Sequence, residues 1–490
     1  MADRTIPAAL ARAATEFGDT EAIVDGDIRW TFAQLATQVY RCADALTSAG
    51  VKRGDRVALW APNSHRYVVA ALGAVTAGAV LVPLNTRFKA GEAGWILGKS
   101  RPALVLVENG FLGIDYLAML PAGTPAIRLD QNWDSFVSSG DAGRAPAEVG
   151  EDDVADMFFT SGTTGMPKGV LATHGQDIRV FTAWADGVGL RHRDRYLIVN
   201  PMFHTFGYKA GVLACLIRGA TMIPQAVFDV GRTLRIIERE KVTVLPGPPT
   251  IYASIIDHPA ASDADLSSLR LAVTGAATVP ARLIERIRES LFREVIIAYG
   301  LSESCGTVTI GEPNGDPALV GKPIDGTEVT VAADTGEVLV RGYHVMRGYF
   351  EDPDATRDAV DADGWLHTGD VGVLDASGNL RITDRLKDMF TVGGFNVYPA
   401  EIEQVLTRHP SVSEAAVVGT PDARLGAVGC AYVVPRPGAT VAEEELIAFC
   451  RERLANFKVP RSVRLVGSLP RNASGKVLKY QLRTWPGPER

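Results

Sequence analysis

The stretch Phe159-Thr160-Ser161-Gly162-Thr163-Thr164-Gly165-Met166-Pro167-Lys168-Gly169 places three glycines, four hydroxyl residues and one lysine in eleven positions. Glycines allow a tight turn that brings backbone N–H groups close to a ligand, and successive N–H groups form a concavity that holds anions. The hydroxyls add neutral donors, and the lysine adds a compact positive charge. Apolar Val154, Met157 and Phe158 lie just before the stretch and predict a strand that leads into it. We interpret the stretch as a polyphosphate-binding loop.

Two better-known phosphate loops do not fit this spacing. A Walker loop needs four residues between its glycines, whereas Gly162 and Gly165 are separated by two. The Rossmann fingerprint does not fit either. A flexible surface turn is the remaining alternative, and it would not need so many hydroxyls together with a lysine.

Composition places the chain among ordinary globular proteins. It has 490 residues, which predicts two to four domains, with 46% hydrophobic and 22% charged residues. The net charge of −7 gives no electrostatic footprint for nucleic acid or a membrane surface. The five cysteines are far apart in the sequence, and no two of them form a C-x-x-C pair. Neither a disulfide framework nor a zinc site is therefore expected.

Targeting signals are not expected, and we predict a cytoplasmic protein. The first sixteen residues lack an apolar run behind a basic start, which argues against a signal peptide. The apolar run from Val68 to Leu84 contains two glycines and a proline and falls short of a membrane span. It is better explained as a buried helix followed by a buried strand.

Strands alternate with helices over most of the chain, which predicts parallel sheets covered by helices on both faces. The expected strands include 56–61, 79–82, 103–107, 196–199, 220–223, 242–245, 269–273 and 295–298. Residues 132–150 are polar and rich in Gly and Ser, which predicts a linker. Short strands bounded by Gly and Asp follow residue 326 and predict a small antiparallel barrel. The last hundred residues or so suit a separate α+β domain.

The loop sequence TSGTTGMPKG resembles the phosphate loop of the adenylate-forming superfamily, which contains acyl-CoA synthetases, luciferases and peptide-synthetase adenylation domains. Further motifs match in the family's order along the chain. The resemblance implies a large N-terminal domain over 1–383, made of stacked αβα subdomains and a small barrel. It also implies a small mobile C-terminal domain over 384–490, with a hinge at Asp384.

The resemblance assigns ATP contacts beyond the loop. It implies that Tyr299-Gly300-Leu301-Ser302-Glu303 stacks on adenine through Tyr299, touches a phosphate through Ser302 and holds Mg²⁺ through Glu303. Asp370, in Trp365-Leu366-His367-Thr368-Gly369-Asp370, would accept hydrogen bonds from the ribose hydroxyls, because a carboxylate offers two acceptor oxygens. The residues expected to bind ATP or AMP are Thr160, Ser161, Gly162, Thr163, Thr164, Gly165, Lys168, Gly275, Ala276, Ala277, Tyr299, Gly300, Ser302, Asp370 and Arg385.

The resemblance also assigns the acyl and CoA sites. His204 would lie beside the acyl carboxylate, with Gly207, Tyr208 and Lys209 as neighbours in the acyl pocket. A packed core histidine and an ordinary structural lysine are the alternatives at His204 and Lys209. Gly393 and Gly394 would line the pantetheine tunnel, although a simple helix-entry loop would have the same sequence. Lys476 would bridge the substrate carboxylate and the α-phosphate as the catalytic lysine.

The resemblance implies an enzyme that couples a carboxylic acid to AMP, with Mg²⁺ as cofactor, and then passes the acyl group to CoA. Longer strings, among them 206–211, 245–252 and 273–280, are similar to the actinobacterial synthetases that activate the indane-dione propanoate left after degradation of steroid rings A and B (HIP). A ligase for medium-chain fatty or aryl acids remains open, as does one that loads a carrier protein. A luciferase-like oxygenase is not formally excluded, and a non-catalytic nucleotide-binding protein would be expected to lack Lys476, Asp370 or Glu303. The oligomeric state is also open, a homodimer included.

Overall fold

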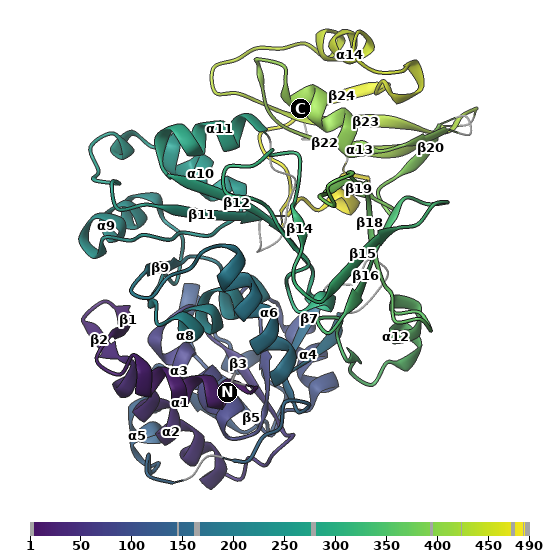
Figure 1. Ribbon diagram of the computed structural model, residues 1–490. Coiled ribbons are helices and arrows are strands. Elements are labelled where there is room, and N and C mark those ends of the chain that lie inside the picture. Colours follow the sequence, from purple (N-terminus) through teal and green to yellow (C-terminus); the bar gives the residue numbers. More distant parts are fainter. Residues whose placement is uncertain are drawn as a thin grey trace.

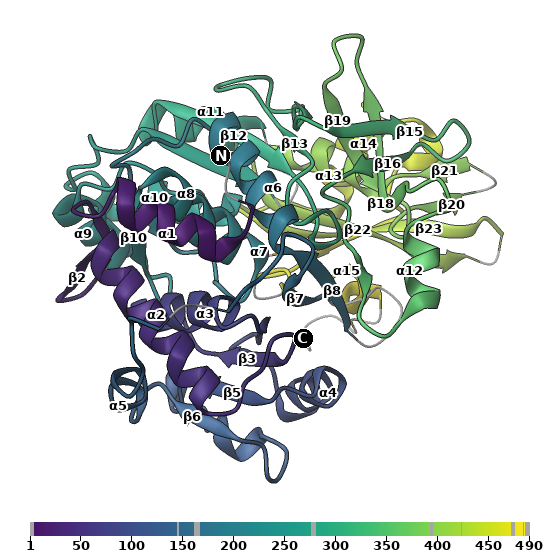
Figure 2. The same ribbon diagram turned by 60° about the horizontal axis from the view of Figure 1, so that its bottom comes forward.

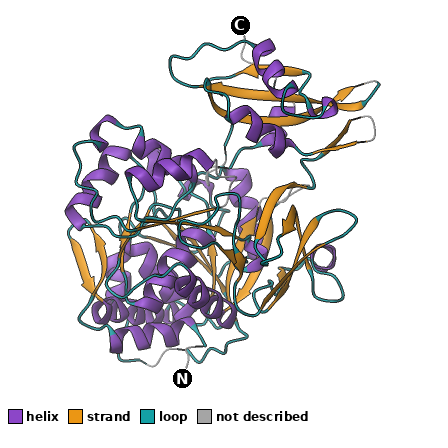
Figure 3. Ribbon diagram, turned by 45° about the horizontal axis from the view of Figure 1, so that its top comes forward, coloured by secondary structure: helices purple, strands orange, loops and turns teal. Residues whose placement is uncertain are grey.

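The computed structural model describes residues 4–144, 147–160, 167–275, 281–392, 395–422, 424–471, 476–483 and 485. A large N-terminal lobe carries a smaller C-terminal lobe on one side, and the chain passes between them after β19 (Figures 1 and 3). None of the helices within these ranges is long and apolar enough to cross a bilayer.

The first sheet of the large lobe has seven strands in the order β17-β8-β7-β4-β3-β5-β6. Strands from β7 to β6 run parallel, whereas β8 is antiparallel to β7 and β17 to β8. Alternate residues of β3 face two separate cores, with Val57 and Leu59 on one side and Ala58 and Trp60 on the other. The strands are β3 (Arg56–Trp60), β4 (Val80–Pro83), β5 (Leu104–Val107), β6 (Ala126–Arg128), β7 (Val154–Thr160), β8 (Lys168–Thr173) and β17 (Gly348–Tyr349).

The second sheet consists of two four-stranded parts, β2-β1-β10-β9 and β11-β12-β13-β14. Val244 joins them, because it bridges Tyr196 of β9 on one side and Leu271 of β11 on the other. The predicted strand over 242–245 is thus reduced to a single bridging residue. The strands are β1 (Glu21–Asp25), β2 (Ile28–Thr31), β9 (Arg195–Ile198), β10 (Thr221–Pro224), β11 (Leu271–Gly275), β12 (Glu294–Tyr299), β13 (Thr309–Ile310) and β14 (Lys322–Pro323).

Helices form layers against both sheets (Figure 2). Tyr196 and Ile198 of β9 face the core that the first sheet also contributes to, whereas Leu197 and Val199 face a core on the far side. The helices that contribute to the shared core are α1 (Ile6–Glu16), α2 (Phe32–Ser48), α3 (His65–Thr76), α5 (Trp133–Ser138), α6 (His174–Gly187) and α8 (Ala214–Arg218). The outer layers contain α4 (Ala90–Ser100) on the first sheet, and α9 (Val230–Glu240), α10 (Pro249–Ile256) and α11 (Ala281–Ser290) on the second.

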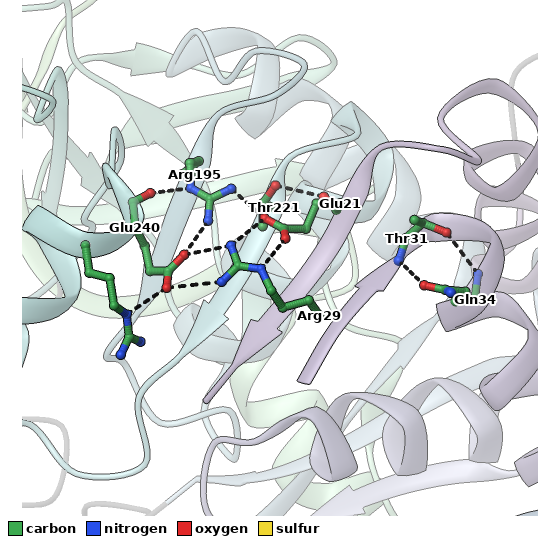
Figure 4. A network of polar contacts seen from close by, with 8 residues as sticks. Glu21, Arg29, Thr31, Gln34, Arg195, Thr221 and Glu240 are labelled. Carbon is green, nitrogen blue, oxygen red and sulfur yellow. Dashed lines mark hydrogen bonds and ion pairs between the residues drawn. The ribbon is translucent and has the colours of Figure 1, made fainter. Parts of the chain in front are cut away.

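Polar contacts stabilise the N-terminus of α2 and one end of the second sheet (Figure 4). The Thr31 hydroxyl accepts from the backbone of Gln34, whose side chain accepts from the Thr31 N–H, a capping box that satisfies two free N–H groups. Arg195 lies between Glu21 and Glu240, at 2.6 and 2.8 Å, and Arg29 also pairs with both carboxylates. These contacts tie β2, β1, β9 and α9 together at the end of the sheet where β9 begins.

The predicted linker over 132–150 was partly wrong. Residues Trp133–Ser138 form α5, which packs against α2 and buries Trp133 and Val137. Two apolar side chains spaced four apart anchor one helical face here, although polar residues surround them.

A third sheet, with antiparallel strands in the order β15-β16-β18-β19, follows in the chain. The sequence predicted a small barrel in this region, and the described strands form a four-stranded sheet. Its strands are β15 (Thr327–Val331), β16 (Glu337–Gly342), β18 (Leu366–Leu374) and β19 (Leu380–Arg385), and α12 (Pro353–Ala359) lies before β18.

The C-terminal lobe has its own sheet and cores. Val417 of β22 faces a core with Ile402 and Leu406, whereas Ala416 and Val418 face a second core on the opposite side. Its elements are β20 (Phe390–Val392), β21 (Phe395–Val397), β22 (Val412–Asp422), β23 (Gly426–Pro435), β24 (Ser462–Leu465), α13 (Pro399–Thr407), α14 (Glu443–Arg451) and α15 (Lys479–Arg483). This arrangement is the predicted α+β domain.

Candidate active site

The proposed phosphate loop joins two antiparallel strands. Thr160, the last residue of β7, pairs with Lys168, the first residue of β8. Residues Ser161, Gly162, Thr163, Thr164 and Gly165 lie outside the described part of the chain, so their predicted roles stay predictions. The hairpin nevertheless fixes where the loop begins and ends.

Glu303 meets the base of this hairpin from a separate part of the chain. Thr160 Oγ1 donates to Glu303 Oε1 at 3.3 Å, and the Tyr349 hydroxyl donates to the same oxygen at 3.0 Å. Lys168 Nζ lies 5.0 Å from the centroid of the Tyr349 ring, a cation–π contact. The short helix η5 (Ser302–Ser304) carries Glu303 together with Ser302 directly after β12. A carboxylate, a hydroxyl and an ammonium therefore surround the start and end of the loop.

Asp370 lies on β18, where side chains from two other strands meet it. The Tyr299 hydroxyl donates to Asp370 Oδ2 at 2.7 Å, and Arg385 Nε lies 2.6 Å from Asp370 Oδ1. Asp370 is buried, and burial next to this carboxylate raises the pKa of Tyr299 well above its usual value. Three residues assigned by sequence to nucleotide binding are thus in mutual contact.

Three glycines at the site, Gly300, Gly207 and Gly275, allow one backbone segment to lie close against another. A Cβ at Gly300 would lie 2.2 Å from the Gly306 carbonyl oxygen, and one at Gly207 would lie 2.1 Å from the Pro201 carbonyl oxygen. Neither contact can be relieved by turning a side chain, because both involve backbone atoms. Gly275 ends β11 in the same way, with Ala298 O at 2.2 Å, and Ala276 and Ala277 lie outside the described residues.

His204 lies at the turn after β9 and caps the short helix α7 (Thr205–Gly207). Its Nδ1 accepts from the Phe206 N–H at 3.2 Å. Burial lowers the pKa of His204 to about 4, so the ring is neutral near neutral pH. Because Nδ1 accepts, the proton is on Nε2, which is therefore a donor.

Tyr208 and Lys209 do not have the surroundings expected of pocket-lining donors. Both side chains are buried in the core, and Lys209 Nζ lies 2.7 Å from Asp177 Oδ1 and 3.0 Å from Asp156 Oδ1. The structure therefore corrects the expectation that Lys209 presents its charge to an acyl group. The reason is the pair of aspartates from β7 and α6, whose approach to Lys209 has no signature in sequence spacing.

Asp384, the predicted hinge, connects the two lobes by a hydrogen bond. Its Oδ2 accepts from the backbone N–H of Ala400 at 2.8 Å, and Ala400 is the second residue of α13. The carboxylate therefore caps a helix of the C-terminal lobe from β19 of the large lobe. Burial raises the pKa of Asp384 to about 6. Gly393 and Gly394 lie outside the described residues.

Lys476 reaches the large lobe from the far end of the chain. The charges of Arg385, Asp370, Lys387 and Asp388 act on its ammonium, and burial lowers the pKa of Lys476 to about 8. Lys476 is separated from Asp370 by more than a hundred residues, so only the packing of the C-terminal lobe brings it near. The lysine, the carboxylate and the arginine form one charged cluster.

Sequence reasoning missed two residues that support this cluster. Tyr349 lies on β17, the strand that pairs with β8, and it donates to Glu303. Glu337 accepts from the Gly369 N–H at 2.8 Å and contacts His367 Nδ1 at 2.9 Å, which holds the segment before Asp370. Neither residue lies within a motif, and only their strand partners indicate their positions.

Comparisons with known proteins identify the family of this chain. Residues 10–350 match the AMP-binding enzyme family, and residues 401–476 match the AMP-binding enzyme C-terminal domain. Two relatives bear the name 3-(7a-methyl-1,5-dioxo-octahydro-1H-inden-4-yl)propanoyl:CoA ligase. The chain is 52% identical to the one from Mycobacterium tuberculosis and 50% identical to the one from Rhodococcus jostii, over 98% of each chain.

A solved structure extends the similarity to the whole fold. The anthranilate CoA ligase AuaEII, crystallised in complex with anthranoyl-AMP, superposes with a TM-score of 0.91 at 28% identity, covering 99% of this chain and 97% of that one. The family match spans both lobes, and the relatives are similar along nearly their full length. This chain therefore belongs to the AMP-binding, adenylate-forming enzyme family.

Proposed function

We propose that the protein is an ATP-dependent acyl-CoA synthetase that first forms an acyl-adenylate and pyrophosphate and then transfers the acyl group to CoA. The observation that carries this proposal is the position of Lys476 within the charged cluster of Asp370 and Arg385. A lysine from the small lobe thereby reaches the residues that the family uses for the nucleotide. A protein that only bound a nucleotide would have no need of it.

Mg²⁺ fits the residues around Glu303. The carboxylate offers a hard oxygen ligand next to the phosphate loop, and the described residues contain no cluster of three or more His, Cys, Asp or Glu side chains that could enclose an ion by themselves. Mg²⁺ is typically held by one or two carboxylates together with substrate phosphates and water. When bound there, it would neutralise charge on the leaving pyrophosphate.

In the first half-reaction the substrate carboxylate has to approach the anionic α-phosphate. Lys476 would offset the repulsion between these two anions and hold them at reacting distance. Lys168 and the Thr160 hydroxyl, together with the loop between them, would hold the β- and γ-phosphates. Asp370 and Arg385 would fix the ribose, so positioning and electrostatic stabilisation would supply most of the catalysis.

In the second half-reaction a thiol has to reach the acyl-adenylate. Lys476 has no further task at this point, whereas the segment with Gly393 and Gly394 has to line a path for pantetheine. Rotation of the C-terminal lobe about Asp384 would move Lys476 away from the site and bring the segment with Gly393 and Gly394 to it. The boundary at Asp384 and the mobility of residues 384–490 are parts of this proposal.

The acid we propose is HIP, the 7a-methyl-1,5-dioxo-octahydroindenyl propanoate of the two ligases described above. Identity of 50% and 52% over nearly the whole chain supports a shared substrate. The acyl group would lie next to His204, whose Nε2–H is a donor, and next to the backbone at Gly207. We place the enzyme in the cytoplasm, where ATP and CoA are available, and all five cysteines are unpaired.

Thioester formation across a panel of acids tests this proposal. Purified protein would be incubated with ATP, MgCl₂, CoA and HIP, octanoate or benzoate, and the products identified by mass spectrometry. We expect HIP-CoA to form with a kcat/KM at least about 10-fold above that for the other acids, as expected when a pocket suits one ring system. Equal or better turnover of octanoate or benzoate would overturn the assignment of the acid, and no thioester with any acid would overturn the activity.

The lowered pKa of Lys476 predicts that kcat/KM of the first half-reaction falls on the alkaline side of its pH profile. The ammonium form is needed to hold two anions, and it is lost as the pH rises through about 8. We therefore expect kcat/KM for pyrophosphate release to fall above that pH, because kcat/KM reports the free enzyme. Lys476→Arg, whose guanidinium stays charged, should lower the rate but remove this alkaline fall. If Lys476→Arg showed the same alkaline fall in kcat/KM as the wild type, the fall would belong to the titration of another group.

A further inference from the structure

Lys209, Asp156 and Asp177 form a buried charge cluster beneath the active site. Their exposed fractions are 1%, 1% and 0%, and the lysine contacts both carboxylates. Phe158 lies over the ammonium, with 5.3 Å between Nζ and the ring centroid. The side chains of the cluster are therefore shielded from bulk solvent, and their contacts are made at low local dielectric.

The pKa values of Asp156 and Lys209 are both raised within the cluster. Burial and the nearby Asp177 raise the pKa of Asp156 well above its usual value. Burial alone would lower the pKa of Lys209, but the two aspartates outweigh it and raise the pKa.

The three residues belong to three segments that each lead to the active site. Asp156 lies on β7, four residues before Thr160, which contacts Glu303. Lys209 lies in the π-helix η3 (Tyr208–Leu213), which follows directly after His204 and α7. π-Helical turns are rare and are frequently found at functional sites. Asp177 lies on α6, which packs against η3.

The turn that carries Glu303 continues to Cys305, which is buried. The charges of Lys209, Asp177 and Asp156 act on the Cys305 thiol. A Cβ at the neighbouring Gly306 would lie 3.3 Å from the Phe181 ring of α6 and 3.5 Å from Thr205 Cβ. The hairpin of β7 and β8, the Glu303 turn and the segment that follows His204 therefore each have a residue in the cluster or within reach of its charges.

Charged residues are an unusual choice for such a support. Replacing a buried ion pair by well-packed apolar residues is often neutral or stabilising, so stability alone does not account for the cluster. Directional contacts to a lysine fix the distance between segments, whereas apolar packing tolerates small slips. That distinction matters where misplacement by about 1 Å can cost 100-fold in rate.

We propose that Lys209, Asp156 and Asp177 are positioning residues for adenylation, which hold the acyl segment in register with the phosphate hairpin and the Glu303 turn. The inference rests on the proposed function. Both half-reactions use the acyl segment, but only the first needs its register with the phosphate hairpin and the Glu303 turn, because pyrophosphate has left before CoA attacks. The cluster should therefore act on the first half-reaction far more than on the second.

The principal test uses the double variant Lys209→Met/Asp177→Asn, which removes the ammonium together with the carboxylate that lies 2.7 Å from it. Pyrophosphate release from ATP and HIP, and thioester formation from purified HIP-AMP and CoA, are measured separately. We expect kcat for the first to fall about 10- to 100-fold and the second to stay within about 3-fold of wild type. Pyrophosphate release within 3-fold of wild type, or an equal fall in both steps, would overturn the proposal.

Asp156 provides a second test that keeps the lysine and Asp177. Asp156→Asn has nearly the shape of the aspartate and can donate to Asp177, whereas Asp156→Leu cannot. We expect the asparagine variant to retain adenylation within about 3-fold and the leucine variant to lose at least about 10-fold, with thioester formation retained in both. Equal adenylation rates in the two variants would contradict a positioning role, and this pair decides the question if the double variant does not fold.

Arg195→Met is the matched control. Arg195 also bridges two carboxylates, Glu21 and Glu240, but at the end of the sheet remote from the site. We expect it to lower the unfolding midpoint while the ratio of the two half-reaction rates stays at the wild-type value. A change of that ratio as large as in the Lys209 variant would overturn the specific role. Wild-type protein inactive in both assays would instead refute the proposed function.

Discussion

Lys476→Ala is expected to stop acyl-adenylate formation while leaving thioester formation from preformed acyl-AMP close to wild type. Lys476 is placed among Asp370, Arg385, Lys387 and Asp388, where its ammonium can neutralise two approaching anions. Removing one such electrostatic group typically costs about 100- to 1,000-fold in rate. The second half-reaction involves no attack on phosphorus, so it should change by less than about 3-fold.

The two half-reactions of the same purified variant serve as each other's control. Pyrophosphate release reports the first, and CoA-dependent consumption of synthetic acyl-AMP reports the second. A misfolded variant would lose both in proportion. Loss of both half-reactions in a variant with the wild-type unfolding midpoint would contradict the proposal that Lys476 acts in the first half-reaction alone.

Asp384→Pro is expected to retain adenylation and to lose about 100-fold in thioester formation. Asp384 is the residue about which the C-terminal lobe would turn, and a proline fixes φ near −65°. The lobe would then stay in the orientation that brings Lys476 to the site. Adenylation needs only this orientation, whereas the pantetheine path needs the other.

Asp384→Ala separates rotation from capping. The Asp384 carboxylate also accepts from Ala400 N–H at the start of α13, and both variants lose this bond. The alanine variant keeps its backbone freedom, so its thioester formation should stay within about 10-fold of wild type, the loss of the cap itself costing ~1 kcal/mol. Equal defects in the two variants would show that capping, not rotation, is what Asp384 contributes.

The strands and helices that could be predicted are those with a strong local signal. Val57 to Trp60 is continuously apolar because both faces of β3 are covered, and this pattern is typical of a parallel sheet. α9 has a similarly strong local signal, because apolar residues recur at helical spacing after Asp229, whose side chain caps the helix. α5 was missed because two buried side chains among polar neighbours give little periodicity in so short a helix.

The motifs of the site could be predicted, whereas their tertiary partners could not. Asp370 and Tyr299 both lie in motifs, yet their contact depends on the packing of β18 against β12. Tyr349 reaches Glu303 only because β17 pairs with β8. Lys209 follows the His204 motif closely in sequence, but Asp156 and Asp177 determine its surroundings, and both lie more than thirty residues before it.

Exchange of labelled pyrophosphate into ATP tests the central claim most directly, because it requires reversible formation of an acyl-adenylate and nothing else. The assay needs purified protein, MgCl₂, ATP, labelled pyrophosphate and HIP, with no CoA present. We expect exchange that depends on HIP, is strong in the wild type, persists in Asp384→Pro and is lost in Lys476→Ala. Wild-type protein that exchanges no label with HIP or with any other carboxylic acid would contradict the account.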